Sequence, residues 1–182
     1  MVQQVNMKYN KVVKTLPKYV DKSVINVMLD RARQHKMRNY IILLILWKTG
    51  IRASELINLR KIDIKSDCIE IRQGKGKKDR IVPLADDLKN ILALYVDSIG
   101  KNDYLFNLKR RQIQNIVHTY EINDYNVHPH TLRHSFAVHC LKNGLNLRSL
   151  QKILGHSNLN TTAVYLDVIA SDVKDDFKNV IW

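Results

Sequence analysis

Residues 41–47 read Ile-Ile-Leu-Leu-Ile-Leu-Trp, an apolar run with no charged or strongly polar side chain. A helix that is apolar on every side is one that the rest of the fold surrounds. We therefore predict a buried helix over residues 37–48, with Gly50 as its stop signal. The run is far shorter than the roughly 20 residues that a membrane-spanning helix needs, so we expect no membrane partner.

The chain around this run has the composition of a globular protein. Its 182 residues are enough for one domain with a real core, and 45% hydrophobic with 26% charged residues argues against a disordered or collagen-like chain. Two cysteines, Cys68 and Cys140, are too few for a disulfide framework. The N-terminus has no signal-peptide pattern. Together these features predict a reducing, cytoplasmic location.

The charge of the chain is strongly positive and unevenly distributed. Thirty Lys and Arg against 17 Asp and Glu give a net charge of +13. This charge favours a nucleic acid as partner, and an anionic membrane is the second candidate. The alternative without a partner is a basic surface that is only solvated. Residues 125–166 contain no Asp or Glu but hold five of the seven histidines. A site that binds phosphate would exclude carboxylates in this way, because like charges repel.

Outside residues 37–48, the hydrophobic period changes between that of helices and that of strands. Residues 68–72 alternate as a strand does, 73–79 form a Gly- and Lys-rich turn, and 80–83 read as the returning strand, ending near Pro83. Helices are expected at 24–34 (with Ser23 as N-cap), 53–59, 86–98, 109–120, 131–143, 147–154, 161–168 and about 171–180. The predicted fold is mainly α with a small antiparallel β-sheet, an α+β class.

Three segments carry charged or nucleophilic side chains at distinctive spacings. They are residues 49–56 (Thr-Gly-Ile-Arg-Ala-Ser-Glu-Leu), 130–134 (His-Thr-Leu-Arg-His) and 154–157 (Leu-Gly-His-Ser), the last followed by Tyr165. With Lys75 in the turn, they resemble the tyrosine recombinase (phage integrase) family, in its Xer-like or archaeal and viral forms. The resemblance rests on the order Arg, Lys, His-x-x-Arg, His, Tyr, and it extends from about residue 16 onward.

The resemblance implies a catalytic-domain fold that cuts and rejoins DNA. Arg52 and Arg133 correspond to two arginines that grip the scissile phosphate, for which the planar, permanently charged guanidinium is well suited. Tyr165 corresponds to the nucleophile, which would form a 3′-phosphotyrosine and release a 5′-hydroxyl. Such an intermediate keeps the energy of the phosphodiester bond, so no cofactor and no metal are expected.

The remaining positions of the motif carry proton transfer and orientation. His130 corresponds to a general base or proton shuttle for the tyrosine, and its unperturbed pKa near 6.5 suits that work. His156 corresponds to a residue that hydrogen-bonds the phosphate or the nucleophile. Lys75, between two glycines at the hairpin tip, would donate a proton to the leaving 5′-oxygen. Glu55, one helical turn after Arg52, would orient Arg52 or His130.

The resemblance also implies partners and a domain plan. The partner is double-stranded DNA, on which a homo-tetramer is expected to assemble from monomers or dimers. A tail helix at about 171–180 would dock on a neighbour or fold back on its own core. Residues 1–15 are predicted to form a basic arm and 16–182 the catalytic domain, without the N-terminal core-binding domain of most relatives. Side chains expected to contact DNA are Arg72, Lys77, Lys78, Arg80, Lys109, Arg110, Arg111 and Arg148. His134 and His139 are interpreted as packing or hydrogen-bonding residues.

Four alternatives stand beside this hypothesis. Residues 147–166 alone resemble a helix-turn-helix that would read a major groove with residues 158–162. His130 and His134 have the spacing of a zinc pair, but Thr131 stands where the zincin motif needs Glu. A catalytically silent architectural protein and a type IB topoisomerase that nicks and reseals complete the set. The residues of the motifs at 50–56 and 154–157 resemble those of recombinases, which favours a recombinase.

Overall fold

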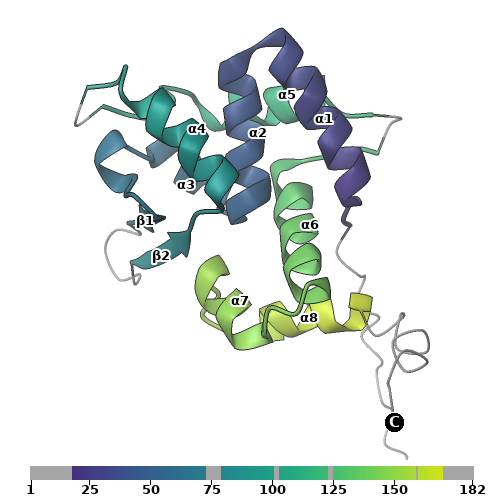
Figure 1. Ribbon diagram of the computed structural model, residues 1–182. Coiled ribbons are helices and arrows are strands. Elements are labelled where there is room, and N and C mark those ends of the chain that lie inside the picture. Colours follow the sequence, from purple (N-terminus) through teal and green to yellow (C-terminus); the bar gives the residue numbers. More distant parts are fainter. Residues whose placement is uncertain (1–17, 73–78, 101–102, 123–124, 159, 170–182) are drawn as a thin grey trace, which may run out of the picture.

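The computed structural model describes residues 18–72, 79–100, 103–122, 125–158 and 160–169. Of residues 167–169 it describes the backbone alone. In the described part, eight α-helices and a short 3-10 helix accompany one two-stranded antiparallel sheet, which confirms the predicted fold class (Figure 1). None of the described helices is long and apolar enough to cross a membrane. The elements are α1 (Lys22–His35), α2 (Met37–Thr49), α3 (Ala53–Asn58), η1 (Lys61–Asp63), β1 (Cys68–Ile71), β2 (Arg80–Pro83), α4 (Asp86–Val96), α5 (Arg110–Thr119), α6 (Pro129–Lys142), α7 (Leu147–Leu154) and α8 (Asn160–Ile169).

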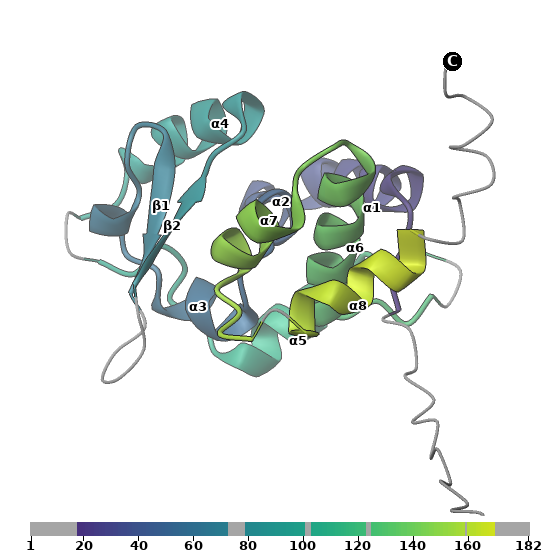
Figure 2. The same cartoon turned by 90° about the horizontal axis from the view of Figure 1, so that it is seen from below.

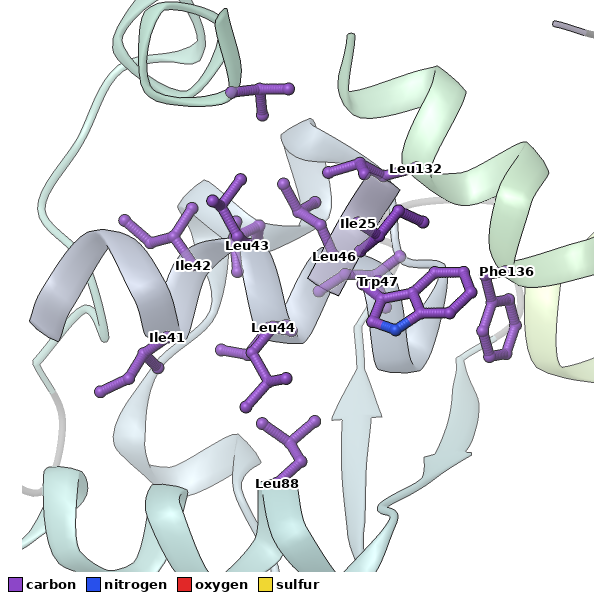
Figure 3. Close-up of a cluster of buried hydrophobic side chains, with 14 of the residues drawn as sticks. Ile25, Ile41, Ile42, Leu43, Leu44, Leu46, Trp47, Leu88, Leu132 and Phe136 are labelled. Carbon is purple, nitrogen blue, oxygen red and sulfur yellow. The ribbon is translucent and has the colours of Figure 1, made fainter. Parts of the chain in front are cut away.

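Helix α2 is the centre of the core, as its apolar run predicts. Ile42, Ile45 and Leu46 have no exposed surface, and helices α1, α4 and α6 pack around them (Figure 3). The helix ends at Gly50, which adopts a left-handed conformation (φ 60°) that favours glycine. The stop signal therefore lies where the sequence indicates, and it turns the chain directly into α3.

The two strands form a hairpin at one side of the helices (Figure 2). Cys68 pairs with Pro83 and Ile71 with Arg80, so that Ile69 and Val82 lie opposite each other on the buried face. Strand β2 also packs against α7. The hairpin tip, which includes the predicted Lys75, Lys77 and Lys78, lies outside the described residues.

The structure differs from the sequence predictions at several helix ends, and α6 begins at Pro129 rather than at residue 131. Helix α1 begins at Lys22, one residue before the predicted cap Ser23, so Ser23 lies inside the helix and Asp21 occupies the cap position. The 3-10 turn η1 is too short for periodicity to reveal. Helix α4 ends at Val96 rather than at residue 98. The predicted tail helix at about 171–180 lies outside the described residues.

Candidate active site

Arg133 lies in the middle of α6 and is almost fully buried, with 3% of its surface exposed. Its Nη1 donates to the carbonyl oxygen of Gly50, and its Nη2 donates to that of Leu154 at 2.7 Å. Gly50 and Leu154 mark the C-terminal ends of α2 and α7, where the helix dipole favours a cation. Burial lowers the pKa of Arg133 to about 10, which still leaves it charged at neutral pH.

His156 follows the end of α7 and connects Arg133 to α8. Its Nε2 lies 3.0 Å from Nη2 of Arg133, and its Nδ1 lies 2.8 Å from Oγ1 of Thr162. Burial and the positive charge of Arg133 lower its pKa to about 4. The ring is therefore neutral at pH 7, accepting from the arginine at Nε2 and donating from Nδ1 to the threonine.

Arg52 precedes α3, and the carboxylate of Glu55 holds it. Its backbone N–H donates to Oε2 of Glu55 at 2.7 Å, and its Nη1 donates to Oε1 at 2.9 Å. Burial by itself would raise the pKa of Glu55, but hydrogen bonds from Arg80 and Arg52 outweigh it and lower the pKa to about 2. Glu55 therefore stays ionised, and the Arg52 side chain is held in place while one third of it remains exposed.

Tyr165 lies on α8 with 2% of its surface exposed. Its hydroxyl oxygen is 2.8 Å from Nδ1 of His134 on α6. Burial lowers the pKa of His134, as do the neighbouring His130 and Arg133. Burial also raises the pKa of Tyr165, although Arg133 and Arg52 oppose that rise. Both groups are thus neutral at pH 7, and the phenol O–H can donate to the lone pair of the imidazole.

His134 is a candidate functional residue that no motif in the sequence reveals. The sequence predicts a packing or hydrogen-bonding role for it, and in the structure its hydrogen bond is to the predicted nucleophile. In the described part of the chain, the hydroxyl of Tyr165 has no hydrogen bond to His130. The ring of His130 lies 6.5 Å from that of His134, with its pKa lowered by partial burial and by Arg133.

Two clefts meet at Arg52. A cleft of about 1480 Å³ lies between the hairpin and α7, and Arg72, Arg148 and His156 are among its lining residues. A second cleft of about 450 Å³ is lined by Arg110 and His130. Arg52 lines both. The predicted DNA contacts Lys109, Arg110 and Arg111 are exposed at the start of α5. The clefts thus present basic side chains on both sides of the predicted phosphate-binding arginine.

One predicted DNA contact, Arg80, is mostly buried in the structure. Arg80 does not face solvent: only 7% of its side chain is exposed, and its guanidinium forms a two-fold hydrogen-bonded ion pair with Glu55. Strand alternation alone cannot reveal this, because the partner lies 25 residues away in the sequence.

Residues 18–171 match the model of the phage integrase family. The chain belongs to this family. Against a tyrosine recombinase of Pseudothermotoga lettingae, it is 39% identical over 94% of its own length and 63% of the relative's. The chain therefore spans less than two thirds of that family member.

Solved structures of the family share this fold. The crystal structure of XerA recombinase superposes with a TM-score of 0.79 at 30% identity, over 92% of this chain and 67% of that one. The XerH site-specific recombinase bound to its difH substrate gives 0.66 at 27% identity, over 90% and 56%.

The helix-turn-helix alternative does not fit the site. Thr162, which the helix-turn-helix interpretation places against a groove, has no exposed surface and bonds His156. Within the described ranges, no three His, Cys, Asp or Glu side chains are grouped so that they could hold a metal ion.

Proposed function

We propose that the protein cuts and rejoins double-stranded DNA at specific sites through a covalent bond between Tyr165 and the 3′-phosphate. The observation that carries this proposal is the arrangement around α6. This helix holds Arg133 at its buried centre and, one residue further on, His134 against the hydroxyl of Tyr165. Helix α6 thereby supplies both the phosphate-binding cation and the proton acceptor, and its neighbour α8 supplies the nucleophile.

The arginines would bind the scissile phosphate. Contacts within the described residues use three of the five N–H donors of Arg133, on Gly50, Leu154 and His156, so two remain for phosphate oxygens. Arg52 reaches the same region from the junction of the two clefts. The negative charge on these oxygens grows in the pentacoordinate transition state, and fixed cations stabilise it most at that point.

Proton transfer completes the reaction. The Tyr165 oxygen attacks phosphorus while its proton passes to Nδ1 of His134, and the bond from phosphorus to the 5′-oxygen breaks. The leaving oxygen takes a proton from Lys75, the lysine between two glycines in the turn of the hairpin. Attack by a 5′-hydroxyl on the phosphotyrosine reverses these steps and reseals the strand. His130 lies beside His134 and would exchange the proton with solvent.

The comparisons support DNA as the substrate. XerH, at 27% identity, has been solved with its difH substrate bound. The net charge of +13 and the basic side chains along both clefts fit the same partner. We place the activity on chromosomal, viral or plasmid DNA in the cytoplasm.

Covalent trapping tests the function. The probe is a pool of 30-base-pair duplexes with randomised sequence and one central nick, from which a short cleaved fragment diffuses away. Incubation with EDTA followed by a denaturing gel should give a slow-migrating protein–DNA adduct, and Tyr165→Phe should give none. Sequencing of the trapped DNA would identify the preferred site. Absence of an adduct with intact DNA binding would contradict the proposal and favour an architectural role.

Strand exchange separates a recombinase from a topoisomerase. Two differently labelled duplexes carrying the trapped sequence should yield joined products, whereas a nicking-closing enzyme would only relax supercoiled DNA. We also propose that exchange takes place in a tetramer on DNA. Deleting residues 171–182 should then impair assembly more than cleavage at a single site, and an equal loss of both would contradict this role of the tail.

A further inference from the structure

Arg80 is a charged residue at the start of β2 whose side chain faces inward. Its Nη1 and Nη2 donate to the two oxygens of Glu55 at 2.8 Å each, and its Nε donates to the carbonyl oxygen of Ile153 at 2.7 Å. The planar fork of the guanidinium makes these three bonds at once, which a lysine cannot reproduce. With 7% of its side chain exposed, Arg80 has little surface left for DNA.

The carboxylate that Arg80 binds is shared with Arg52. Each oxygen of Glu55 accepts two hydrogen bonds, Oε1 from the Nη1 atoms of Arg80 and Arg52, and Oε2 from Nη2 of Arg80 and the backbone N–H of Arg52. A carboxylate offers about four such sites, so this one is saturated. Arg80 thereby fixes the plane of the group that orients Arg52.

The third bond of Arg80 reaches the end of α7. Ile153 precedes Leu154, whose carbonyl oxygen accepts from Arg133, and His156 lies two residues further on. A Cβ at Gly155 would lie only 2.8 Å from Cδ of Arg80, so the chain passes closely over its side chain. One buried guanidinium therefore contacts both the support of Arg52 and the turn that carries His156.

We infer that Arg80 is a positioning residue that sets Arg52 and the end of α7 in the arrangement that binds the scissile phosphate. The inference rests on the proposed function and extends it to a residue that contacts no substrate. It contradicts the expectation that Arg80 binds DNA directly. The two roles differ in what they do to DNA affinity and to the rate of cleavage.

The first test is the salt dependence of binding to a 30-base-pair duplex of arbitrary sequence. Loss of one phosphate contact makes the negative slope of log K against log salt less steep by about 0.9. We expect no such change for Arg80→Gln. The matched variant is Arg72→Gln, which removes an arginine with a 55% exposed side chain from the same hairpin and should make the slope less steep. A less steep slope in Arg80→Gln would overturn the inference.

The second test is the single-turnover rate of adduct formation at saturating protein, on the duplex trapped from the randomised pool. Arg80→Gln should slow this rate by about 10- to 100-fold, because a small displacement of a catalytic group is that costly. Arg80→Lys should not restore it. Glu55→Gln should be similarly slow, and the double variant no slower than the worse single one, because both act through one contact. Additive losses would count against the inference.

The pKa of the Glu55 carboxyl distinguishes positioning from a general loss of structure. This pKa is about 2 in the wild type, and in Arg80→Gln it should rise, since burial is then opposed by Arg52 alone. A ¹³C NMR titration of the Glu55 carboxyl, assigned by its absence in Glu55→Gln, measures this rise in the folded protein. An unshifted Glu55 titration in Arg80→Gln would contradict the inference. If the wild type forms no adduct, the proposed function fails, while the slopes still decide whether Arg80 contacts DNA.

Discussion

The hydroxyl oxygen of Tyr165 lies 2.8 Å from Nδ1 of His134, across the contact between α8 and α6. A buried phenol keeps its proton, and burial keeps the imidazole neutral, so the two groups form a donor–acceptor pair before DNA arrives. Arg133, next to His134 on the same helix, supplies positive charge that would favour the phenolate as it forms. The chain thus holds the proposed nucleophile in contact with a proton acceptor.

His134→Phe should slow adduct formation more than His130→Phe. Removal of a general base costs about 10²- to 10⁴-fold in rate, and we expect the lower part of that range for His134 because His130 lies nearby. The measurement is the single-turnover rate on the trapped duplex, with DNA affinity as the control. A larger loss in His130→Phe would assign the proton to that ring instead.

The free energy of unfolding should decrease as the pH is lowered through the window set by the pKa of His156. Its pKa is about 4 in the folded protein against about 6.5 unfolded, so the unfolded state binds more protons between these values. The free energy of unfolding is then complete above pH 6.5 and decreases towards pH 4, by up to about 3 kcal/mol for this group. The pKa values of His130, His134 and His139 are also lowered and act with the same sign.

Urea unfolding at pH 7, 5.5 and 4 measures this dependence. The comparison is His156→Gln, in which the slope between pH 6.5 and 4 should become shallower by the part that His156 contributes. An identical slope in both proteins would show that His156 is not the group responsible. Glu55 acts with the same sign at the acid end of this window, because its pKa is about 2 in the folded protein against about 4.5 unfolded, but it is present in both proteins and cancels in the comparison.

The sequence predicts those parts of the fold that local pattern determines. The apolar run of α2 with Gly50 behind it, and the alternation of the hairpin strands, decide the fold class without tertiary information. The caps are less certain: Ser23 is a good cap residue, yet Asp21 occupies that position. A two-residue shift of this kind depends on how α1 packs against α2.

The site is predicted only where a motif carries its chemistry. Arg80 and His134 have ordinary neighbours in the sequence, and their partners Glu55 and Tyr165 lie 25 and 31 residues away. Contacts between elements decide which charged residue of a strand turns inward. They also decide which histidine of a helix contacts α8. No spacing rule contains that information.

DNA affinity should fall steeply with salt, because phosphate contacts dominate it. Arg148→Gln, on the exposed face of α7 beside the large cleft, should weaken binding evenly across sequences and lower the salt slope by about 0.9. Lys36→Gln is the matched control, since the corner between α1 and α2 lies at the opposite end of the molecule from α7 (Figure 1). A titration without salt dependence would contradict DNA binding through phosphates.

Gly50→Ala should destabilise the fold more than Gly144→Ala. Both glycines have positive φ, 60° and 84°, so each substitution strains the backbone by about 1 kcal/mol. Only at Gly50 would the new Cβ also run into the ring of Phe136, whereas at Gly144 nothing lies within 4 Å. We expect an additional loss of roughly 1–3 kcal/mol in the unfolding free energy of Gly50→Ala.

Activity extends the same comparison. The carbonyl of Gly50 accepts a hydrogen bond from Arg133, so a shift of this turn moves the arginine that we propose to bind phosphate as well. Adduct formation measured at a temperature where Gly50→Ala is still folded should therefore be slower than in Gly144→Ala. Equal rates in the two variants would mean that Arg133 keeps its position without the Gly50 carbonyl, and that its bond to Leu154 is sufficient to hold it.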